Sequence, residues 1–405
     1  MKLFQYEMKK LLFNKNRLIL LSVMFVVYAL LGFTSIVGES ELSNTDQTKN
    51  GRSEYMRLVS ENTGKLNPEQ LAESKAIFQA ALTEHGRGEA IQLELSRNPA
   101  LKFHREYAAF GQRVDQYWNG PDEQDQESIK GVYPIQDKLK ELESTNQTDT
   151  YEHRYYTKRL ETELSLGEPV FENIVFWNYY FTTFDGMEVV FLLLMVLTFF
   201  ISPLFTQEVR TEMDSIVLSS AKGRREIVTA KLLCAGATSA IVTAVFLVGP
   251  FIGTCIGYGD LSGFDAPARG LEALQSTMLD MTIGGAAALG AAWLVLTAVV
   301  FGLALGFISS KTKSQSAAFG LGIVILLAGS MSKNLGRDIQ KLIWPLADFN
   351  FGTLSSFGEI FGGVKAYSVF GLPVSYGTVA FAVCIALGAL AALLTYFAQK
   401  KRSVV

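Results

Sequence analysis

The chain has 405 residues and a net charge of −3, with 49% hydrophobic and only 19% charged residues. An ordinary soluble protein carries about 25% charged residues. Here the deficit is concentrated in stretches of roughly 20 residues without an ionisable side chain, the length that crosses a bilayer as a helix. This composition excludes a soluble enzyme and a disordered chain. The slightly acidic balance also argues against nucleic-acid binding, which requires a basic face.

Six uninterrupted apolar windows predict an α-helical polytopic membrane protein with six transmembrane helices. The first window is too long for the apolar region of a secretory signal peptide, so we expect it to span the membrane. The predicted spans are 18–37, 187–206, 232–257, 282–308, 315–332 and 374–398.

The distribution of Lys and Arg predicts the orientation of these spans. Fifteen of them lie in the terminal segments and short loops on one side, and five lie in the short loops on the other side. Cytoplasmic loops carry the excess of positive charge in membrane proteins. We therefore expect both termini to be cytoplasmic and the long loop 38–186 to be extracellular.

The loop 38–186 has the size and charge density of a folded soluble domain, with 16 Lys or Arg and 26 Asp or Glu residues. Its pattern is mainly helical. Asn67-Pro68 and Asn98-Pro99 resemble helix N-caps followed by proline in the first turn. Further helical segments are expected at about 127–144 and 150–166. The sequence therefore predicts a large, mainly helical extracellular domain between the first two spans.

Two groups of side chains in this domain allow alternative interpretations. One group forms either the core of the domain, which we favour, or an aromatic surface for a cargo or partner: Tyr107, Phe110, Tyr117 and Trp118. The other group lacks the spacing of metal ligands and is expected on the solvated surface: His85, His104 and His153. The three cysteines lie within apolar runs and are expected to be buried thiols: Cys234, Cys255 and Cys384.

The predicted membrane part has no ionisable residue in the middle of any span. Glu188 is the nearest and falls at the outer end of the second span. An ion-driven transporter normally needs such a residue near the bilayer midplane. The chain also lacks a G-x-x-x-x-G-K-[ST] phosphate-binding loop, so energy for any transport is expected from another subunit. Small residues such as Gly290, Gly302 and Gly388 predict close helix packing or, alternatively, a sliding interface.

The most informative segment is 205–233, which leaves the second span after Pro203 and returns to the membrane behind a cluster of basic residues. A short amphipathic helix here either contacts a partner protein or is a solvated connector. The residues expected at such a contact are Glu208, Arg210, Glu212, Met213, Ile216, Val217 and Arg224.

This layout resembles the permease subunits of type-2 ABC exporters, the ABC-2 family. The shared features are six spans, a glutamate just inside the second span, and a short helix before the third span. The N-terminal segment 1–17 resembles the family's amphipathic interfacial helix, with Leu3, Phe4 and Met8 on one face. Residues 333–373 resemble its short hydrophobic helices on the outer side of the membrane domain, 187–405.

The resemblance implies a non-catalytic permease that binds no cofactor itself. It would pair with a second permease subunit, as a homodimer or heterodimer, and with two copies of an ATP-binding subunit that bind ATP and Mg. The loop 207–231 would contact these ATPases. The cargo would be an amphiphilic peptide, antibiotic or lipid, with antimicrobial peptides slightly favoured, in a bacterial plasma membrane. The alternative is a peptide-sensing membrane receptor module without transport.

Overall fold

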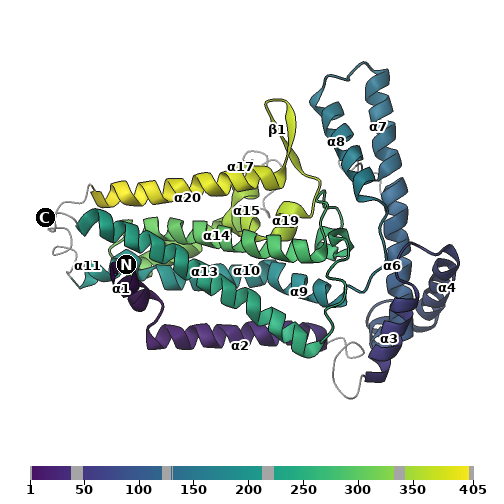
Figure 1. Cartoon of the computed structure of the whole chain (residues 1–405), viewed down its shortest axis with the longest axis horizontal. Coiled ribbons are helices and arrows are strands. Elements are labelled where there is room, and N and C mark those ends of the chain that lie inside the picture. The colour runs from purple at the N-terminus through teal and green to yellow at the C-terminus, as the bar shows by residue number, and fades with distance from the viewer. Residues whose placement is uncertain are drawn as a thin grey trace.

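The computed structural model describes residues 2–37, 49–120, 129, 131–211, 223–332 and 343–400. In these ranges the chain is mostly helical, and six helical segments are long and apolar enough to cross a membrane, as predicted. They lie side by side as one bundle (Figure 1). The segments are α2 (Lys15–Val37), α10 (Met187–Ile201) with α11 (Pro203–Arg210), α13 (Gly223–Gly257), α14 (Ile283–Lys311), α15 (Gln315–Ser332) and α20 (Tyr376–Lys400).

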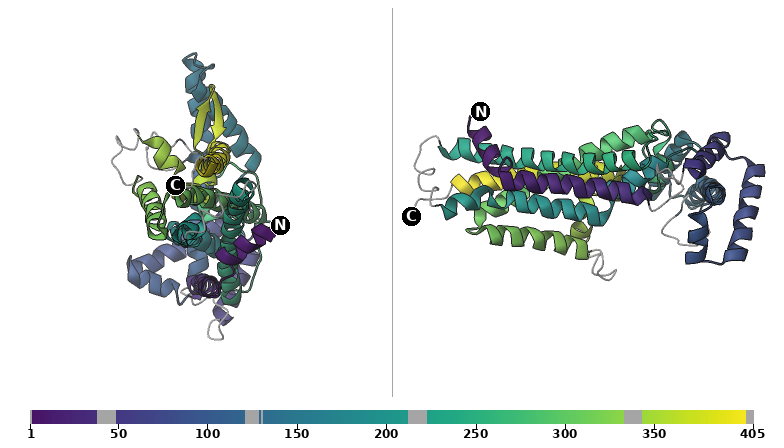
Figure 2. Two further views of the ribbon diagram at one scale, coloured as in Figure 1. Left: turned by 90° about the vertical axis from the view of Figure 1, so that its left-hand side faces the viewer. Right: turned by 90° about the horizontal axis from the view of Figure 1, so that it is seen from below.

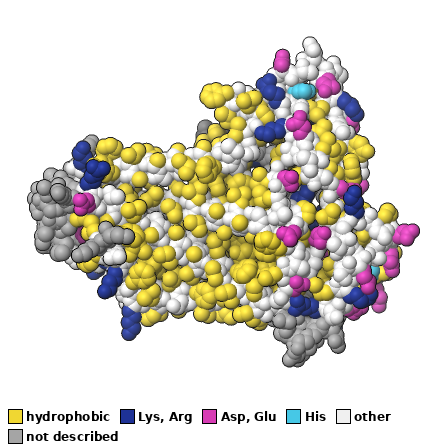
Figure 3. Space-filling model, in the orientation of Figure 1, with side chains coloured by type: hydrophobic (Ala, Val, Ile, Leu, Met, Phe, Trp, Pro, Cys, Tyr) yellow, Lys and Arg dark blue, Asp and Glu magenta, His cyan; other side chains and the backbone are white. Residues whose placement is uncertain are grey.

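The charged residues of these six segments lie almost entirely at one end of the bundle. Glu188 is the exception, since it lies in the first turn of α10 at the opposite end. Both described ends of the chain, Lys2 and Lys400, lie at the charged end, which faces the viewer on the left of Figure 2. On the face shown in Figure 3, hydrophobic side chains cover the bundle between this end and the region of the remaining helices. The bundle therefore has two chemically different ends joined by an apolar middle.

The second span is broken between α10 and α11. Pro203 has no N–H to continue the helical hydrogen bonding. A side chain of α14 compensates: the Ser309 hydroxyl accepts from the N–H of Phe205 at 3.0 Å and donates to the carbonyl of Ser202 at 2.8 Å. The break is thus satisfied inside the bundle, and α11 continues the span to Arg210.

Close helix packing depends on glycine where α2 and α13 cross. A Cβ on Gly253 would lie 1.9 Å from the carbonyl oxygen of Ala29. Similarly, a Cβ on Gly302 of α14 would lie 2.1 Å from the Ser239 hydroxyl of α13. Small residues let helix backbones approach closely in membranes. At Gly302 the structure shows the first of the two predicted alternatives, which is close packing between two helices of the same chain.

Helix α1 (Lys2–Leu11) forms the N-terminal element, and its apolar side contacts protein. Met8 and Leu11 are buried in the main hydrophobic core. The Cys234 thiol of α13 lies 3.4 Å from the Phe4 carbonyl. The Arg17 guanidinium of α2 donates to the Leu11 carbonyl, which α1 leaves without a helical partner at its end. The side expected to face lipid is therefore covered by α13.

The segment between the first two spans contains a set of helices that we call the helical unit. Its elements are α3 (Lys49–Glu61), α4 (Pro68–His85), α5 (Glu89–Leu95), α6 (Pro99–Asn119), α7 (Val132–Ser144) and α8 (Tyr151–Leu166). Asn67 and Asn98 cap α4 and α6 as predicted, because their side-chain oxygens accept from the N–H groups of Glu69 and Leu101, each at 3.0 Å. The helical unit lies beyond one end of the bundle (Figure 1).

The aromatic residues of α6 are mostly buried, as in the favoured interpretation, but the core that they join is continuous with that of the bundle. Tyr107 and Phe110 are fully buried, and Tyr117 is 6% exposed. The half-buried Trp118 donates its indole N–H to Glu168 at 2.9 Å. Tyr107 and Phe110 are therefore core residues, whereas Trp118 is only half-buried and Tyr117 also lines a cavity.

The prediction of a solvated surface position is wrong for His104. It is only 9% exposed, and its Nδ1 lies 3.0 Å from the Ser74 hydroxyl. It follows Phe103 on the buried side of α6, and burial lowers the pKa of its imidazole. His85 is exposed, as expected.

The last helix within the predicted extracellular domain 38–186 belongs with the bundle rather than with the helical unit. Helix α9 (Val175–Asp185) packs on the bundle, with Phe176 and Tyr180 each 5.5 Å from the Phe251 ring of α13. Its aromatic residues provide the apolar surface for this contact. The helical unit ends before α9, near the bridge between Gly64 and Phe171.

The predicted outer helices are only partly correct. Residues 333–342 fall outside the described part, and the remainder includes three short helices, α17 (Trp344–Phe349), α18 (Phe351–Ser355) and α19 (Phe357–Phe361). Instead of a further helix, β1 (Ala366–Val369) and β2 (Leu372–Ser375) form an antiparallel hairpin. Its turn residues Phe370 and Gly371 have φ of 51° and 79°, the backbone of a two-residue hairpin turn.

Candidate functional site

A buried group of charged side chains lies where α1, α11 and α13 meet, at the charged end of the bundle (Figure 1). We call it the charge cluster, and it consists of Glu7, Lys10, Glu208 and Lys231. The Lys231 Nζ lies 2.7 Å from Glu208 Oε1 and 3.2 Å from Glu7 Oε2. Lys10 Nζ lies 3.6 Å from the same Glu208 oxygen. The two carboxylates are therefore balanced by two ammonium groups.

Lys231 is the centre of the charge cluster. Its side chain is 0% exposed, and its Nζ also donates to the Leu204 carbonyl at 2.7 Å. An ammonium group has three donors, and Glu7, Glu208 and Leu204 supply three acceptors. A buried charge is tolerated only when it is paired and hydrogen-bonded in this way.

The local sequence explains why these groups converge. On α1, Glu7 is four residues from both Leu3 and Leu11, so it shares the face that packs on the bundle. On α11, the Leu204 carbonyl and the Glu208 side chain are one helical turn apart. On α13, Lys231 is three residues before the buried Cys234. Each charged group thus lies on the buried side of its own helix.

The charge cluster contains one of the residues expected at the partner contact, Glu208. Arg210 is exposed at the end of α11, and Arg224 lies in the first turn of α13. Glu212, Met213, Ile216 and Val217 fall outside the described residues. The helix α13 begins at Gly223, so the predicted loop 207–231 overlaps helix at both of its ends.

The sequence does not predict the pairing of Glu7 with Lys231, which are 224 positions apart. A signal was present in α1, because Glu7 interrupts the apolar face formed by Leu3 and Leu11. A carboxylate on such a face needs a buried cation, although its identity is not readable from the sequence. In the sequence, Lys231 contributes only to the positive charge that predicts the cytoplasmic side.

A second set of polar contacts, which we call the unit junction, attaches the helical unit to the opposite end of the bundle. Arg269 pairs with Glu163 at 2.8 Å, and both side chains are 9% exposed. Arg269 also donates to the Gly167 carbonyl at 3.0 Å. Arg113 of α6 donates to the Gly270 carbonyl at 3.2 Å. Arg269 and Gly270 belong to the connection between α13 and α14, so this connection holds the unit in place.

The described residues offer no evident set of metal ligands, since no three His, Cys, Asp or Glu side chains in these ranges are arranged to hold an ion. The thiols of Cys234 and Cys384 are buried and that of Cys255 is half-buried, and all three are free. In the charge cluster, all three donors of Lys231 have acceptors. Such an arrangement links the three helices that contribute to it.

The chain matches no protein-family model, and comparison with curated proteins finds no match.

Proposed function

We propose that this chain is the permease subunit of an ATP-driven exporter that moves an amphiphilic cargo outward. The observation that carries the proposal is the charge cluster. Through Lys231, the segment leaving the second span is bonded to both α1 and α13. A displacement of α11 by a partner is therefore transmitted to two further elements of the bundle.

The composition of the spans supports an external source of energy. Along the six apolar segments, the charged side chains lie near the ends. A proton- or sodium-driven transporter requires an ionisable or ion-binding group near the midplane. In the proposed mechanism ATP and Mg bind to two copies of a separate ATP-binding subunit, and a second permease subunit completes the path for cargo.

The proposed orientation follows from the positive charge at one end of the bundle. With this end in the cytoplasm of a bacterial cell, both chain termini and the charge cluster are cytoplasmic. The helical unit is then extracellular, on the side where the cargo is released. Closure of the ATPase pair would push on the segment that begins with the exposed Arg210 and move α11, with α13 and its close partner α2 following.

Arg210 provides the sharper test because Glu208 is also needed for the buried cluster. The chain is co-expressed with candidate ABC ATP-binding subunits from the same organism, purified, and reconstituted in proteoliposomes. Arg210→Glu is expected to reduce co-purification of the ATPase and cargo-dependent ATP hydrolysis at least about tenfold, as for loss of a central charged contact. Lys313→Glu is the matched control, since Lys313 is exposed between α14 and α15 at the same end. If Arg210→Glu and Lys313→Glu retain the same ATPase co-purification and the same cargo-dependent ATP hydrolysis, Arg210 does not contact the ATPase.

A peptide-sensing receptor is the second candidate function, and a cavity beside the helical unit favours it. The two functions differ in their coupling to ATP. A receptor would bind its ligand while the hydrolysis rate of any associated ATPase stayed constant. An exporter would hydrolyse ATP faster when its cargo is present and accumulate the cargo on the outer side.

A further inference from the structure

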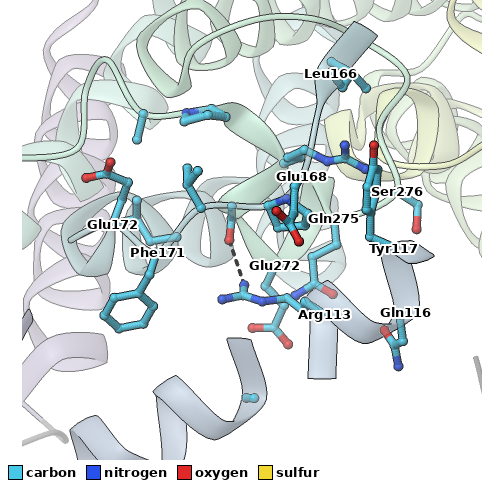
Figure 4. A pocket seen from close by; sticks show the side chains of 18 of the residues that line it. Arg113, Gln116, Tyr117, Leu166, Glu168, Phe171, Glu172, Glu272, Gln275 and Ser276 are labelled. Carbon is cyan, nitrogen blue, oxygen red and sulfur yellow. Dashed lines mark hydrogen bonds between the residues drawn. The ribbon is translucent and has the colours of Figure 1, made fainter. Parts of the chain in front are cut away.

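A cavity of about 620 Å³ lies between the helical unit and the bundle. Its walls include one face of α6, Arg159 and Glu163 of α8, residues 166–178, and residues 266–276 from the connection between α13 and α14. In Figure 4, Glu172 and Tyr117 lie toward opposite sides of the cavity with Arg113 between them. The size is that of a ligand-binding pocket.

The shape of the cavity suits an extended chain. Its lining residues on α6 include Glu106, Ala109, Arg113 and Gln116, which recur every three or four positions and so share one helix face. From Glu106 to Tyr117 this face is roughly 16 Å long at 1.5 Å per residue. An extended peptide of about five residues covers the same distance.

The charge of the lining favours a cationic occupant. Five carboxylates and three arginines line the cavity. The Glu163–Arg269 pair neutralises one of each, so four carboxylates remain with Arg113 and Arg159. Glu172 has no ion-pair or hydrogen-bond partner among the described residues, and burial raises the pKa of its carboxyl group. A bound cation would stabilise the ionised form.

The two arginines provide an independent observation that indicates a ligand. Arg159 is only 3% exposed, and its Nε–H is buried without an acceptor in the part of the chain that the structure describes. The Nε–H of Arg113 is likewise buried without an acceptor among the described residues. Buried donors are normally hydrogen-bonded. Backbone carbonyl oxygens of a peptide are suitable acceptors, which a simple metal cation or polyamine does not offer.

We propose that this cavity binds an extended cationic peptide segment, with ammonium groups against Glu172 and Glu272 and backbone carbonyl oxygens toward Arg113 and Arg159. The proposal concerns binding. Only the further step, that this peptide class is the exported cargo, rests on the proposed function. Glu272 is exposed at the mouth of the cavity, so a long peptide can continue into solvent beyond the bound segment.

The test measures fluorescence anisotropy of fluorescein-labelled pentalysine with the full chain in phosphatidylcholine nanodiscs. The zwitterionic lipid avoids binding of the peptide to an anionic membrane. Glu172→Gln combined with Glu272→Gln is expected to weaken binding at least about tenfold, because two charge-assisted contacts are lost. Ala109→Trp, which fills the groove on α6, is expected to abolish binding without changing any charge.

The matched control is Glu84→Gln combined with Glu161→Gln, which removes two exposed carboxylates of the helical unit outside the cavity. It is expected to bind within about twofold of the wild type, as for screened surface charges. Pentalysine acetylated on its side chains is expected not to bind. Absence of saturable binding to the wild type, unchanged binding in the cavity variants, or an equal loss in the control would overturn the proposal. Arg210→Glu should bind pentalysine normally, so failure of ATPase contact and failure of peptide binding are separate results.

Discussion

Both ends of the bundle contain buried ion pairs, but the two ends differ in whether charged groups remain accessible to a ligand. In the charge cluster, Lys231 is fully buried and each of its three donors has an acceptor. At the unit junction, Glu163 and Arg269 are each 9% exposed and lie beside a cavity with surplus carboxylates. The first end is a closed link between helices, and the second is open to a ligand.

The difference also concerns which elements are joined. Glu7, Glu208 and Lys231 connect parts of one helical bundle. Arg269 connects the bundle to the helical unit, whose buried aromatic residues on α6 belong to the same continuous core as the bundle. A change at the charge cluster should therefore affect the whole bundle, whereas a change at the unit junction should affect how the unit is held.

The largest expected effect is that of Lys231→Met. This change leaves Glu7 and Glu208 buried without their cation, and removal of one partner from a buried ion pair costs about 3–5 kcal/mol. Thermal unfolding of the purified chain in detergent micelles should show a large decrease in midpoint. Lys10→Met is the control, because Lys10 is 21% exposed and a pair of this kind contributes about 0–1 kcal/mol. Similar midpoints for the two variants would contradict the role of Lys231 as the buried cation that both carboxylates need.

The next effect is that of Arg269→Met at the unit junction. We expect a loss of about 2–3 kcal/mol, below the value for a fully buried pair because water reaches both side chains. Limited proteolysis should then cut the connection between α13 and α14 faster. Arg57→Met removes an exposed pair with Glu61 within α3 and should leave the cleavage rate unchanged. If the two variants are cleaved at the same rate, Arg269 does not hold the helical unit.

The sequence predicts the spans well because long apolar windows are a local property. It predicts the beginning of α13 nine residues too late, since Arg225 and Lys231 interrupt the apolar window although they are helical. The charge cluster depends on Glu7 and Lys231, whose contact is set by tertiary packing and has no periodic pattern. For the hairpin 366–375, the apolar composition indicates a helix, whereas the chain reverses at Phe370 and Gly371 and its two halves pair as strands.

A smaller effect, dependent on pH, is expected at Asp185 near the unit junction. Its carboxylate accepts from the N–H groups of Phe357 and Gly358, which lowers its pKa, but burial has the larger effect and raises the pKa to about 6. A raised pKa means that the folded state binds the proton more tightly. The stabilisation is present in full below the ordinary pKa of 3.8 and is lost as pH rises through about 6.

Unfolding midpoints between pH 4 and pH 7 test this expectation. The wild type should lose about 2 kcal/mol over this range, after allowance for partial exposure. Asp185→Asn should show a smaller decrease, because its side chain does not titrate. Parallel pH profiles would show that the carboxyl group has an ordinary pKa.

The smallest effect is expected at Phe370, in the hairpin whose turn accepts a hydrogen bond from α8 through the Gly371 carbonyl. Phe370 has a φ of 51°, a conformation that costs a residue with an ordinary side chain about 1 kcal/mol. Phe370→Asn produces an Asn-Gly turn, which adopts this backbone readily, and should raise the stability by about 0.5–1 kcal/mol. Phe370→Ala keeps the unfavourable backbone and removes the same ring, so the difference between the two variants isolates the backbone effect from any contact of the exposed ring with lipid. Equal midpoints for the two variants would mean that the backbone of the turn is not strained at Phe370.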